Sequence, residues 1–441
     1  MTGATTDFDP IAYINEPRWQ EVRLGLDRMT ELFERMGRPQ DRLKFVHVAG
    51  TNGKGSTCAY VASVLQAAGY RTGLFTSPYI IQFEERIRVN GANISSEELR
   101  AVTLFVREHA EALAAERGEH PTEFELMTAV AFEHFARSAC DIVVCEVGLG
   151  GRLDSTNVIE SPEVSVITAL ALDHTDFLGD TLQAIAREKA GIIKPGVPVV
   201  SWPQEDAGAC RSIEDAARAC GCTVTSPDFS QLEVHDVGED GVRPFSYCGR
   251  EYRTRLLASY QPYNATVAIE VIGALRGRGW KITDRALEEG IVQTSWPGRF
   301  EVVSAQAPAI IVDGGHNPQG AAALVSSLRD VFPGKPVTFV MSVLADKDYR
   351  TMIRTVLPLA NAFVCVTPPN PRALSAADLV AAIQEEAAEA GVALSAVTPV
   401  ATFAEALAEA RRLAGSAGAG GVICAFGSLY SIAEIKSALE G

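Results

Sequence analysis

The sequence predicts an α/β protein with two domains. The first is expected to be a mononucleotide-binding P-loop domain with a mainly parallel sheet and a small antiparallel insert, and the second a Rossmann-like α/β domain. Three observations support this. Strand patterns alternate with helical patterns, a glycine-rich turn follows the first strand, and the alternation restarts after Ser295-Trp-Pro-Gly-Arg-Phe300. We therefore place the domains at 1–295, with a short N-terminal helical segment, and at 296–441.

The composition is typical of a soluble globular enzyme. The chain has 441 residues, 47% of them hydrophobic and 21% charged, and no apolar run reaches the length of a membrane span. Residues 1–9 are polar and acidic rather than signal-like, so we expect a cytoplasmic protein. Nine cysteines, none in a C-x-x-C pair, are expected to be reduced thiols. The net charge of −16 argues against nucleic acid or an anionic membrane as a partner.

A glycine-rich turn is the strongest signal in the first domain. Residues 46–57, Val-His-Val-Ala-Gly-Thr-Asn-Gly-Lys-Gly-Ser-Thr, lead from a buried strand into a helix. Unpaired N–H groups and the dipole at a helix N-terminus favour an anion, and glycines let the backbone approach a phosphate closely. Lys54 adds a positive charge, and Ser56 or Thr57 offers a hydroxyl. The alternative is a turn that only caps a helix. The candidate phosphate-binding residues are Gly50, Thr51, Asn52, Gly53, Lys54, Gly55, Ser56 and Thr57.

The remaining elements of the first domain follow from hydrophobic periodicity, apolar runs and capping residues. Ser95 with Glu98 forms a capping box, Thr122 caps the next helix, and alternating polarity near Arg250 indicates the antiparallel insert. In chain order we expect helix 18–36, strand 43–48, helix 56–68, strand 71–78, a loop at 79–91, helices 95–117 and 122–135, strands 141–147 and 164–172, helix 181–193, strand 197–200, the insert at 226–257, and helices 261–275 and 283–293.

The second domain repeats the alternation. We expect strands at 309–313, 337–342, 362–366 and 421–426, and helices at 320–331, 376–390 and 404–413. Polar sequences follow three of these strands, Asp313-Gly-Gly-His-Asn-Pro318, Ala345-Asp-Lys-Asp348 and Gly427-Ser-Leu-Tyr430. Two domains that present such strand ends suggest a cleft between them.

Polar residues at the strand ends of the first domain are candidates for holding a metal. A nucleotide on a phosphate loop needs Mg²⁺, which prefers oxygen donors. Glu146 and a hydroxyl of Ser77 or Ser56 are suitable, whereas His174 is a less usual magnesium ligand. The alternatives are a structural salt bridge for Glu146 and a strand-capping role for His174.

Three further residues have two interpretations each. Lys189 could act at the site, or could extend to solvent or pair with Glu188. Arg299 could reach a phosphate, or could form a salt bridge in the hinge. Asp313, together with His316, could contact ribose, base or substrate, or could cap the following helix.

Eight motifs identify a family. In chain order they are Gly50-Thr-Asn-Gly-Lys-Gly-Ser-Thr57, Thr76-Ser-Pro78, Glu146-Val-Gly-Leu-Gly-Gly-Arg152, Leu172-Asp-His-Thr175, Phe177-Leu-Gly179, Glu188-Lys-Ala-Gly191, Pro297-Gly-Arg299 and Asp313-Gly-Gly-His-Asn-Pro318. Together they resemble folylpolyglutamate synthase and the bifunctional dihydrofolate synthase/folylpolyglutamate synthase, within the Mur ligase superfamily. The resemblance covers nearly the whole chain.

The resemblance implies an ATP-dependent ligase that adds L-glutamate to dihydropteroate, to reduced folates such as tetrahydrofolate, or to both. The acceptor carboxylate would take the γ-phosphate of ATP, giving an acyl phosphate that the glutamate amine attacks. The cofactors would be ATP and two Mg²⁺ ions. Because an acyl phosphate hydrolyses, closure of the domains about the hinge is expected. The family suggests a monomer with small-molecule substrates and no nucleic-acid or membrane partner.

By motif position, the resemblance also assigns roles to single residues. The expected catalytic residues are Lys54, His174, Lys189 and Arg299. The expected magnesium ligands are Ser77, Glu146 and His174, with a carbamylated Lys189 for the second ion. Beyond the phosphate loop, ATP would contact Asn264, Arg299 and Asp313. The expected substrate-binding residues are Arg86, Arg152, Asp154, Asn157, His316 and Ser428.

Departures from the family pattern leave alternatives open. Tyr260 stands where members often have His, so it receives no role, and Gly315 stands where Ala is more familiar. The loop that ends at Asn157 resembles that of bifunctional bacterial enzymes, in which Asp154 approaches the pterin, so we favour both activities. The alternatives are a monofunctional folylpolyglutamate synthase, a P-loop ATPase or kinase, and a non-catalytic ATP-binding regulator. A cell-wall amino-acid ligase would need another domain where only about 45 residues precede the phosphate loop.

Overall fold

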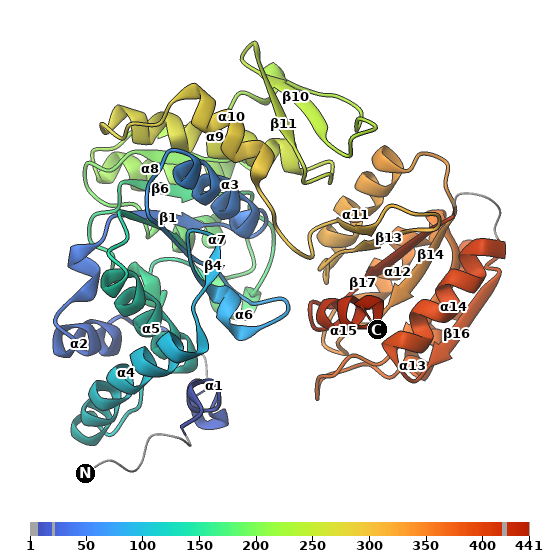
Figure 1. The fold of residues 1–441 in the computed structure, drawn as a ribbon, viewed down its shortest axis with the longest axis horizontal. Coiled ribbons are helices and arrows are strands. Elements are labelled where there is room, and N and C mark those ends of the chain that lie inside the picture. Colours follow the sequence, from blue (N-terminus) through green and yellow to red (C-terminus); the bar gives the residue numbers. More distant parts are fainter. Residues whose placement is uncertain (1–7, 20–22, 417–420, 441) are drawn as a thin grey trace. The chain divides into compact units, whose positions relative to one another are not determined.

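The computed structural model describes residues 8–19, 23–416 and 421–440 (Figure 1). The N-terminal residues 1–7, on which part of the localisation argument rests, lie outside the described residues. The chain divides into two compact units. The first comprises Met1–Glu233, Ser246–Tyr252 and Tyr263–Thr294, and the second Val234–Phe245, Arg253–Pro262 and Ser295–Gly441. The expected domain limits at 295 and 296 stay a prediction.

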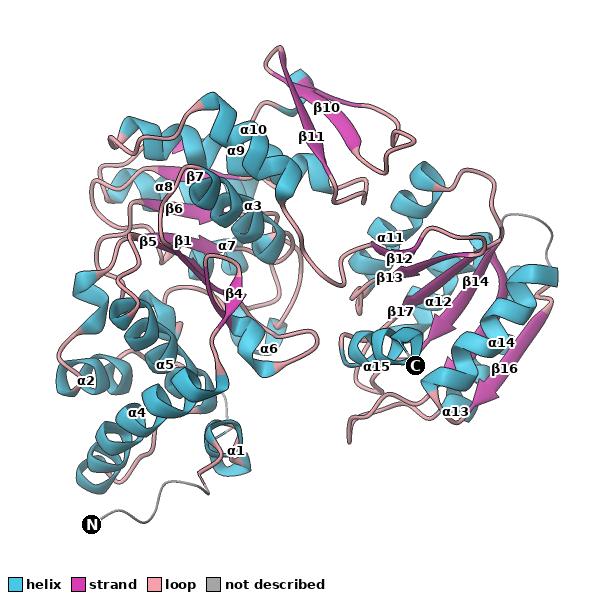
Figure 2. Cartoon of the chain, in the orientation of Figure 1, coloured by secondary structure: helices cyan, strands magenta, loops and turns pink. Residues whose placement is uncertain are grey.

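An eight-stranded sheet forms the centre of the first unit, in the order β4-β3-β2-β5-β1-β6-β7-β8 (Figure 2). The strands from β2 to β8 in this order run parallel, and β3 and β4 form an antiparallel edge. The carboxyl ends of β5, β1 and β6 therefore lie side by side. The strands are β1 (Phe45–Ala49), β2 (Thr72–Phe75), β3 (Ile87–Val89), β4 (Ala92–Asn93), β5 (Ile142–Glu146), β6 (Val164–Ile167), β7 (Val199–Ser201) and β8 (Val224–Thr225).

The helices up to residue 293 largely follow their capping residues. Ser95 and Thr122 each form both hydrogen bonds of a capping box, and Thr181 and Thr283 cap their helices. The helices are α1 (Pro10–Ile14), α2 (Asp27–Arg35), α3 (Lys54–Ala67), α4 (Ser96–Arg117), α5 (Glu123–Arg137), α6 (Thr175–Leu178), α7 (Leu182–Ala190), α8 (Ala207–Ala219), α9 (Gln261–Gly277) and α10 (Asp284–Gln293).

Three local predictions in this part of the chain are wrong. Residues 87–89, expected in a loop, form β3, because the side chain of Ile87 is buried in the core. The expected strand 164–172 ends at Ile167, after which the chain turns to meet the phosphate loop. The expected helix 18–36 begins only at Asp27, because Gly25 has a φ of +146°, outside the helical region. Residues 20–22 of that prediction lie outside the described residues.

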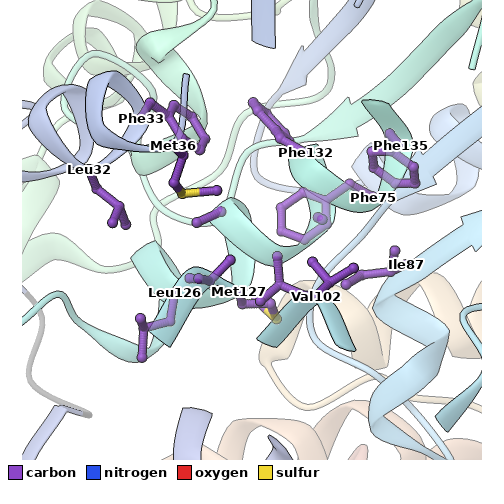
Figure 3. Close-up of a cluster of buried hydrophobic side chains, with 14 of the residues drawn as sticks. Leu32, Phe33, Met36, Phe75, Ile87, Val102, Leu126, Met127, Phe132 and Phe135 are labelled. Atoms are coloured by element: carbon purple, nitrogen blue, oxygen red, sulfur yellow. The ribbon is translucent and has the colours of Figure 1, made fainter. Parts of the chain in front are cut away.

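A hydrophobic cluster packs α2 and α5 against the sheet (Figure 3). The ring centroid of Phe132 on α5 lies 5.6 Å from that of Phe33 on α2 and 4.9 Å from that of Phe45 on β1. Phe75 and Ile87 join the cluster from β2 and β3, and all five side chains are buried. The cluster therefore fixes three strands of the sheet from one side.

A small sheet of three strands confirms the expected antiparallel insert. Its order is β11-β10-β9, and Cys248 and Gly249 form the two-residue turn between β10 and β11. The strands are β9 (Leu232–Val234), β10 (Arg243–Tyr247) and β11 (Arg250–Thr254).

A buried arginine ties the insert to the second unit. Arg243 is 1% exposed and donates to the carbonyl of Leu257 (3.0 Å) and to Asp330 Oδ2 (2.5 Å) on helix α11 (Pro318–Val331). The backbone N–H of Ser259 donates to Ser327 Oγ (3.1 Å) on the same helix. These bonds explain why 234–245 and 253–262 belong to the second unit.

The second unit confirms the expected α/β domain. Its sheet has the order β12-β13-β17-β14-β15-β16, parallel except for β12. Strands β12 and β16, which were not expected, lie at the edges, and β16 contains Pro399, as edge strands can. The elements are β12 (Glu301–Ser304), β13 (Ala309–Val312), α11, β14 (Val337–Met341), α12 (Tyr349–Val356), β15 (Ala360–Val366), α13 (Ala376–Ala390), β16 (Ala396–Val400), α14 (Phe403–Ser416), β17 (Val422–Phe426) and α15 (Tyr430–Glu440). Of the helices described in either unit, none has the length and apolar character needed to cross a membrane.

The core of the first unit can be tested at Phe132. Replacement by alanine leaves a cavity among aromatic rings, so we expect Phe132→Ala to lower the free energy of unfolding by about 3–5 kcal/mol. Urea unfolding followed by tryptophan fluorescence reports mainly on this unit, which holds Trp19, Trp202 and Trp280, whereas Trp296 belongs to the second unit. Phe177→Ala is the control, because Phe177 is 49% exposed and should cost less than about 1 kcal/mol. Equal effects of the two substitutions would contradict the assignment of the core.

Candidate functional site

The phosphate loop connects β1 to α3, and two of its glycines are required by close approaches. Gly50 has a φ of +149°, and a Cβ atom there would overlap the side chain of Thr168. Gly53 has a φ of +84°, and a Cβ atom would lie 2.5 Å from Asn264 Oδ1. Gly53 is also the N-cap of α3 and has no side chain with which to cap the helix. The backbone therefore leaves room for an anion at the start of α3, and Asn264 on α9 lies beside it.

Two side chains of the loop are placed for phosphate chemistry. Lys54, the first residue of α3, donates from Nζ to the carbonyl of Thr51 (3.2 Å), so its charge lies over the loop. Thr57 is fully buried, and its Oγ1 has no hydrogen-bond partner among the described residues. A buried hydroxyl without a partner is costly unless a ligand supplies one.

Two of the expected magnesium ligands, Ser77 and Glu146, lie at the ends of the neighbouring strands β2 and β5, whereas His174 lies seven residues beyond the end of β6. Glu146 ends β5 beside Val48 of β1, is buried, and accepts a hydrogen bond from the N–H of Ser77 (3.2 Å). His174 is the N-cap of α6 with a φ of +49°, and its ring lies 3.9 Å from Asp173. No group of three or more His, Cys, Asp or Glu side chains that could hold a metal occurs within the described ranges. The donor set still fits Mg²⁺, which proteins hold by one or two carboxylates together with nucleotide phosphates.

Lys189 on α7 contacts the phosphate loop. It is 5% exposed, and its Nζ donates to the carbonyl of Gly50 (2.8 Å). Burial, and then the nearby charge of Lys54, lower the pKa of Lys189 to about 7, against the opposing charges of Asp173 and Asp154. A large share of this amine is therefore neutral at pH 7 and able to react with carbon dioxide.

The alternative interpretations of Lys189 are wrong. Its side chain neither extends to solvent nor pairs with Glu188, because Glu188 Oε1 pairs instead with Arg152 Nη2 at 3.0 Å.

The loop at 148–157 packs onto the end of α7. The N–H of Arg152 donates to the carbonyl of Glu188 (2.7 Å), and Asn157 Nδ2 donates to the carbonyls of Arg152 (2.9 Å) and Gly191 (3.1 Å). A Cβ atom on Gly151 would lie 2.7 Å from the carbonyl of Glu188. The structure thus joins Arg152 and Asn157 to the helix that carries Lys189.

Asp154 belongs to this loop, and its side chain is buried. Its Oδ2 accepts from the N–H of Leu149 (2.8 Å), and its Oδ1 accepts from the N–H (3.0 Å) and hydroxyl (2.5 Å) of Thr156. Burial raises the pKa of Asp154. The same hydroxyl lies 2.8 Å from Nε2 of His47 on β1. Burial lowers the pKa of His47 to about 3, so this imidazole is neutral at pH 7.

Sequence reasoning missed the role of His47. The available signal was a polar residue between two valines, Val46 and Val48, in an otherwise apolar strand. His47, Thr156 and Asp154 connect the central strand to the loop at 148–157.

Arg86 lies at the end of the 3₁₀ helix η3 (Phe83–Arg86) and is buried. Its guanidinium carbon lies 5.0 Å from the ring centroid of Tyr79 and 5.3 Å from that of Phe83, and its Nη1 lies 3.5 Å from Glu123 Oε1. The structure surrounds Arg86 with residues that the sequence did not single out.

The expected residues of the second unit gather at the ends of β13 and β17. Asp313 follows β13, is buried, and accepts from the N–H groups of Gly315 (2.7 Å) and Phe300 (2.8 Å). Burial raises the pKa of Asp313, against the nearby charges of Arg299 and His316. Ser428 follows β17, the neighbour of β13, and is buried. The N–H of Gly427 donates to the carbonyl of Gly315 (3.0 Å), so the two loops are bonded together.

One alternative for Asp313 is wrong. It does not cap the following helix, because the N-cap of α11 is Asn317, which accepts from the N–H of Gly320 (2.7 Å).

The low pKa of Lys189 predicts a pH-dependent stability. The pKa of a free lysine side chain is about 10.4, so between pH 7 and 10.4 the unfolded chain binds more protons at this position and stability rises with pH. Relative to Lys189→Met, wild type should gain about 2–4 kcal/mol in free energy of unfolding from pH 7 to pH 10, measured by urea unfolding in carbon-dioxide-free buffer. Lys281→Met, at an exposed lysine, should show no such trend. A pH-independent difference for Lys189→Met would contradict the assignment.

Comparisons with known proteins identify the family. Residues 48–272 match the Mur ligase middle domain, and residues 298–429 match the Mur ligase, glutamate ligase domain. Dihydrofolate synthase/folylpolyglutamate synthase of Bacillus subtilis is 41% identical over 365 residues, covering 81% of this chain and 84% of the relative. A Mycobacterium tuberculosis folylpolyglutamate synthase complexed with ADP and AMPPCP superposes with a TM-score of 0.86 at 30% identity, over 98% of this chain and 99% of the other. Escherichia coli FolC in complex with DHPP and ADP gives 0.83 at 27% identity, over 99% of both chains. The chain therefore belongs to the Mur ligases, and among them to the family of folylpolyglutamate synthases and dihydrofolate synthases.

Proposed function

We propose that this protein is an ATP-dependent ligase that joins L-glutamate both to dihydropteroate and to reduced folates such as tetrahydrofolate. The observation that carries the proposal is the bond from Lys189 Nζ to the carbonyl of Gly50. It joins the phosphate loop to the helix onto which the loop at 148–157 packs. In the first unit, the proposed nucleotide-binding groups would thus lie beside a polar loop suited to an acceptor.

The reaction that fits this arrangement has two steps. An oxygen of the acceptor carboxylate attacks the γ-phosphorus of ATP, and the bond to the β-phosphate oxygen breaks, giving an acyl phosphate and ADP. The glutamate nitrogen then attacks the acyl carbon, and the C–O bond to phosphate breaks, giving an amide, phosphate and a released proton. Backbone N–H groups at the start of α3 and the charge of Lys54 stabilise negative charge during phosphoryl transfer.

The nucleotide site extends over Gly50, Thr51, Asn52, Gly53, Gly55, Ser56 and Thr57, with Asn264 beside Gly53. Ser77, Glu146 and His174 would hold Mg²⁺, and a carbamate on Lys189 would hold a second ion. Bound magnesium screens the negative charges of phosphate and carboxylate as they approach. The near-neutral pKa of Lys189 supports the carbamate, which forms only on an uncharged amine.

The second unit supplies a further group of residues. We assign Arg299 and Asp313 to ATP, and His316 and Ser428 to ATP or glutamate. Their support is the cluster at the ends of β13 and β17, where the strand ends of a parallel sheet offer a ligand site.

The acceptor site is assigned to Arg86, Arg152, Asp154 and Asn157. The relative from Bacillus subtilis carries both activities in its name, and the Escherichia coli structure contains DHPP. These names support two acceptors for the present chain. A monofunctional folylpolyglutamate synthase is the alternative, and a P-loop ATPase or kinase is the alternative of a different class. A cytoplasmic monomer without nucleic-acid or membrane partners stays a prediction.

The proposed function is tested by ADP release from the purified protein with ATP, Mg²⁺ and L-glutamate. We expect turnover with 7,8-dihydropteroate and with tetrahydrofolate, and background release when either acceptor or glutamate is omitted. Lys54→Ala is the inactive control, because it removes the charge over the phosphate loop; we expect at least about a hundredfold loss of kcat. Turnover with tetrahydrofolate alone would show a monofunctional enzyme, and the assignment of Asp154 to the acceptor site would be withdrawn. ADP release in the absence of both the acceptor and glutamate would show an ATPase instead of a ligase.

The carbamate on Lys189 is tested by chemical rescue. Lys189→Ala should lose most activity and regain part of it when a short carboxylic acid such as acetate is added, because the acid replaces the missing carboxylate. Lys281→Ala should be active and unaffected by acetate. The carbamate would be excluded if acetate failed to rescue Lys189→Ala and if native mass spectrometry of wild type showed no added carbon dioxide.

A further inference from the structure

The segment that follows β6 has no backbone neighbour on the side of β7. The β6–β7 pairing ends at Ile167 opposite Ser201, and the N–H of Trp202 donates to the carbonyl of Ile167 (2.8 Å). The next residue of that chain is Pro203, which has no N–H to donate. Residues 168–171 therefore continue beyond the point where β7 can pair with them.

The side chain of Gln204 takes the place of the missing strand. Its Nε2 donates to the carbonyl of Thr168 (3.0 Å), and its Oε1 accepts from the N–H of Leu170 (3.0 Å). In a parallel ladder, one residue bonds in the same way to the carbonyl and the N–H that flank its opposite residue. A carboxamide has the donor and the acceptor of a peptide group, so Gln204 extends the ladder by one residue opposite Ala169.

The other edge of the same segment holds the phosphate loop. The carbonyl of Ala169 accepts from the N–H groups of Thr51 (2.9 Å) and Asn52 (3.0 Å), and Thr51 Oγ1 donates to the carbonyl of Ala171 (3.2 Å). The N–H of Thr168 donates to the carbonyl of Ala49 (2.8 Å), just before Gly50. We call residues 168–171 the strap. It is the antiparallel partner of the loop at Asn52 and Ala169.

We propose that Gln204 is a positioning residue of the nucleotide site, acting on the phosphate loop through the strap. Glycine-rich loops lose much backbone freedom when they become ordered, and the strap supplies the partners that hold this one. The strap is itself fixed by Gln204 on its opposite edge. Loss of the carboxamide frees one carbonyl and one N–H of the strap, so the loop must be ordered by the nucleotide on binding, and affinity falls.

The inference rests on the proposed function only in taking an adenine nucleotide as the ligand of the loop. Its test is the dissociation constant of ADP with Mg²⁺, measured by calorimetry on the full chain at 15 °C, well below the unfolding of each variant. Two lost hydrogen bonds predict that Gln204→Ala weakens ADP about tenfold. A residue that only stabilises the fold would lower the unfolding temperature and leave this constant unchanged.

Gln204→Glu gives a readout specific to the carboxamide geometry. A protonated Glu keeps both the donor and the acceptor of Gln, whereas the carboxylate loses the donor and faces the carbonyl of Thr168. At pH 8, where a Glu side chain is ionised, we expect Gln204→Glu to bind ADP at least about tenfold more weakly than wild type. Gln183→Glu, at an exposed glutamine on the neighbouring α7, controls for added charge and should bind as wild type.

The outcomes separate the inference from the proposed function. Gln204→Ala or Gln204→Glu within twofold of wild type at pH 8 overturns the role of Gln204. If wild type binds ADP but forms no amide, the proposed ligase function is wrong, and the ADP affinities of the Gln204 variants still test the role of Gln204. Wild type that binds no ADP overturns both.

Discussion

The candidate site depends on one bond, from the buried Nζ of Lys189 to the carbonyl of Gly50. The close approach of the backbone at Gly50 makes this bond possible, because any side chain there would collide with Thr168. Through Lys189 the phosphate loop is joined to α7, and through α7 to the loop at 148–157. Burial at this contact also lowers the pKa of the amine. One packing constraint thus sets both the shape of the loop and the chemistry of the lysine.

Positive potential is supplied locally in a protein whose formal net charge is −16. Lys54 and the backbone N–H groups of α3 provide it at the nucleotide site, and Arg299 lies near Asp313 in the second unit. Other buried polar groups bond to one another, as Nε2 of His47, Thr156 and Asp154 do. Such networks hold a geometry firmly because each lost bond leaves a buried group without a partner.

Much of the first sheet could be predicted from local sequence. Capping residues such as Thr122 set helix starts, and apolar runs set the central strands, because both signals are local. The short strand β3 and the edge strands β12 and β16 could not be predicted, since their pairing depends on neighbours distant in sequence. The end of β6 was missed for a related reason: the residues after Ile167 are apolar enough for a strand, but their partners are the phosphate loop and Gln204. Sequence motifs identified Lys189 and Glu146, but their hydrogen-bond partners, the carbonyl of Gly50 and the N–H of Ser77, could be identified only from the structure.

The bonds of Arg243 to Leu257 and Asp330 have a consequence for how such chains can recombine. The second unit draws two segments from the middle of the chain, so it is not a continuous stretch of the gene. A chimera joined at residue 295 would take these segments from one parent and α11 from the other. The buried guanidinium would then face a carboxylate that had evolved with a different insert. A chimera of two relatives should fold when the insert and the C-terminal half come from the same parent. The segments that must be exchanged together are therefore not contiguous in the gene.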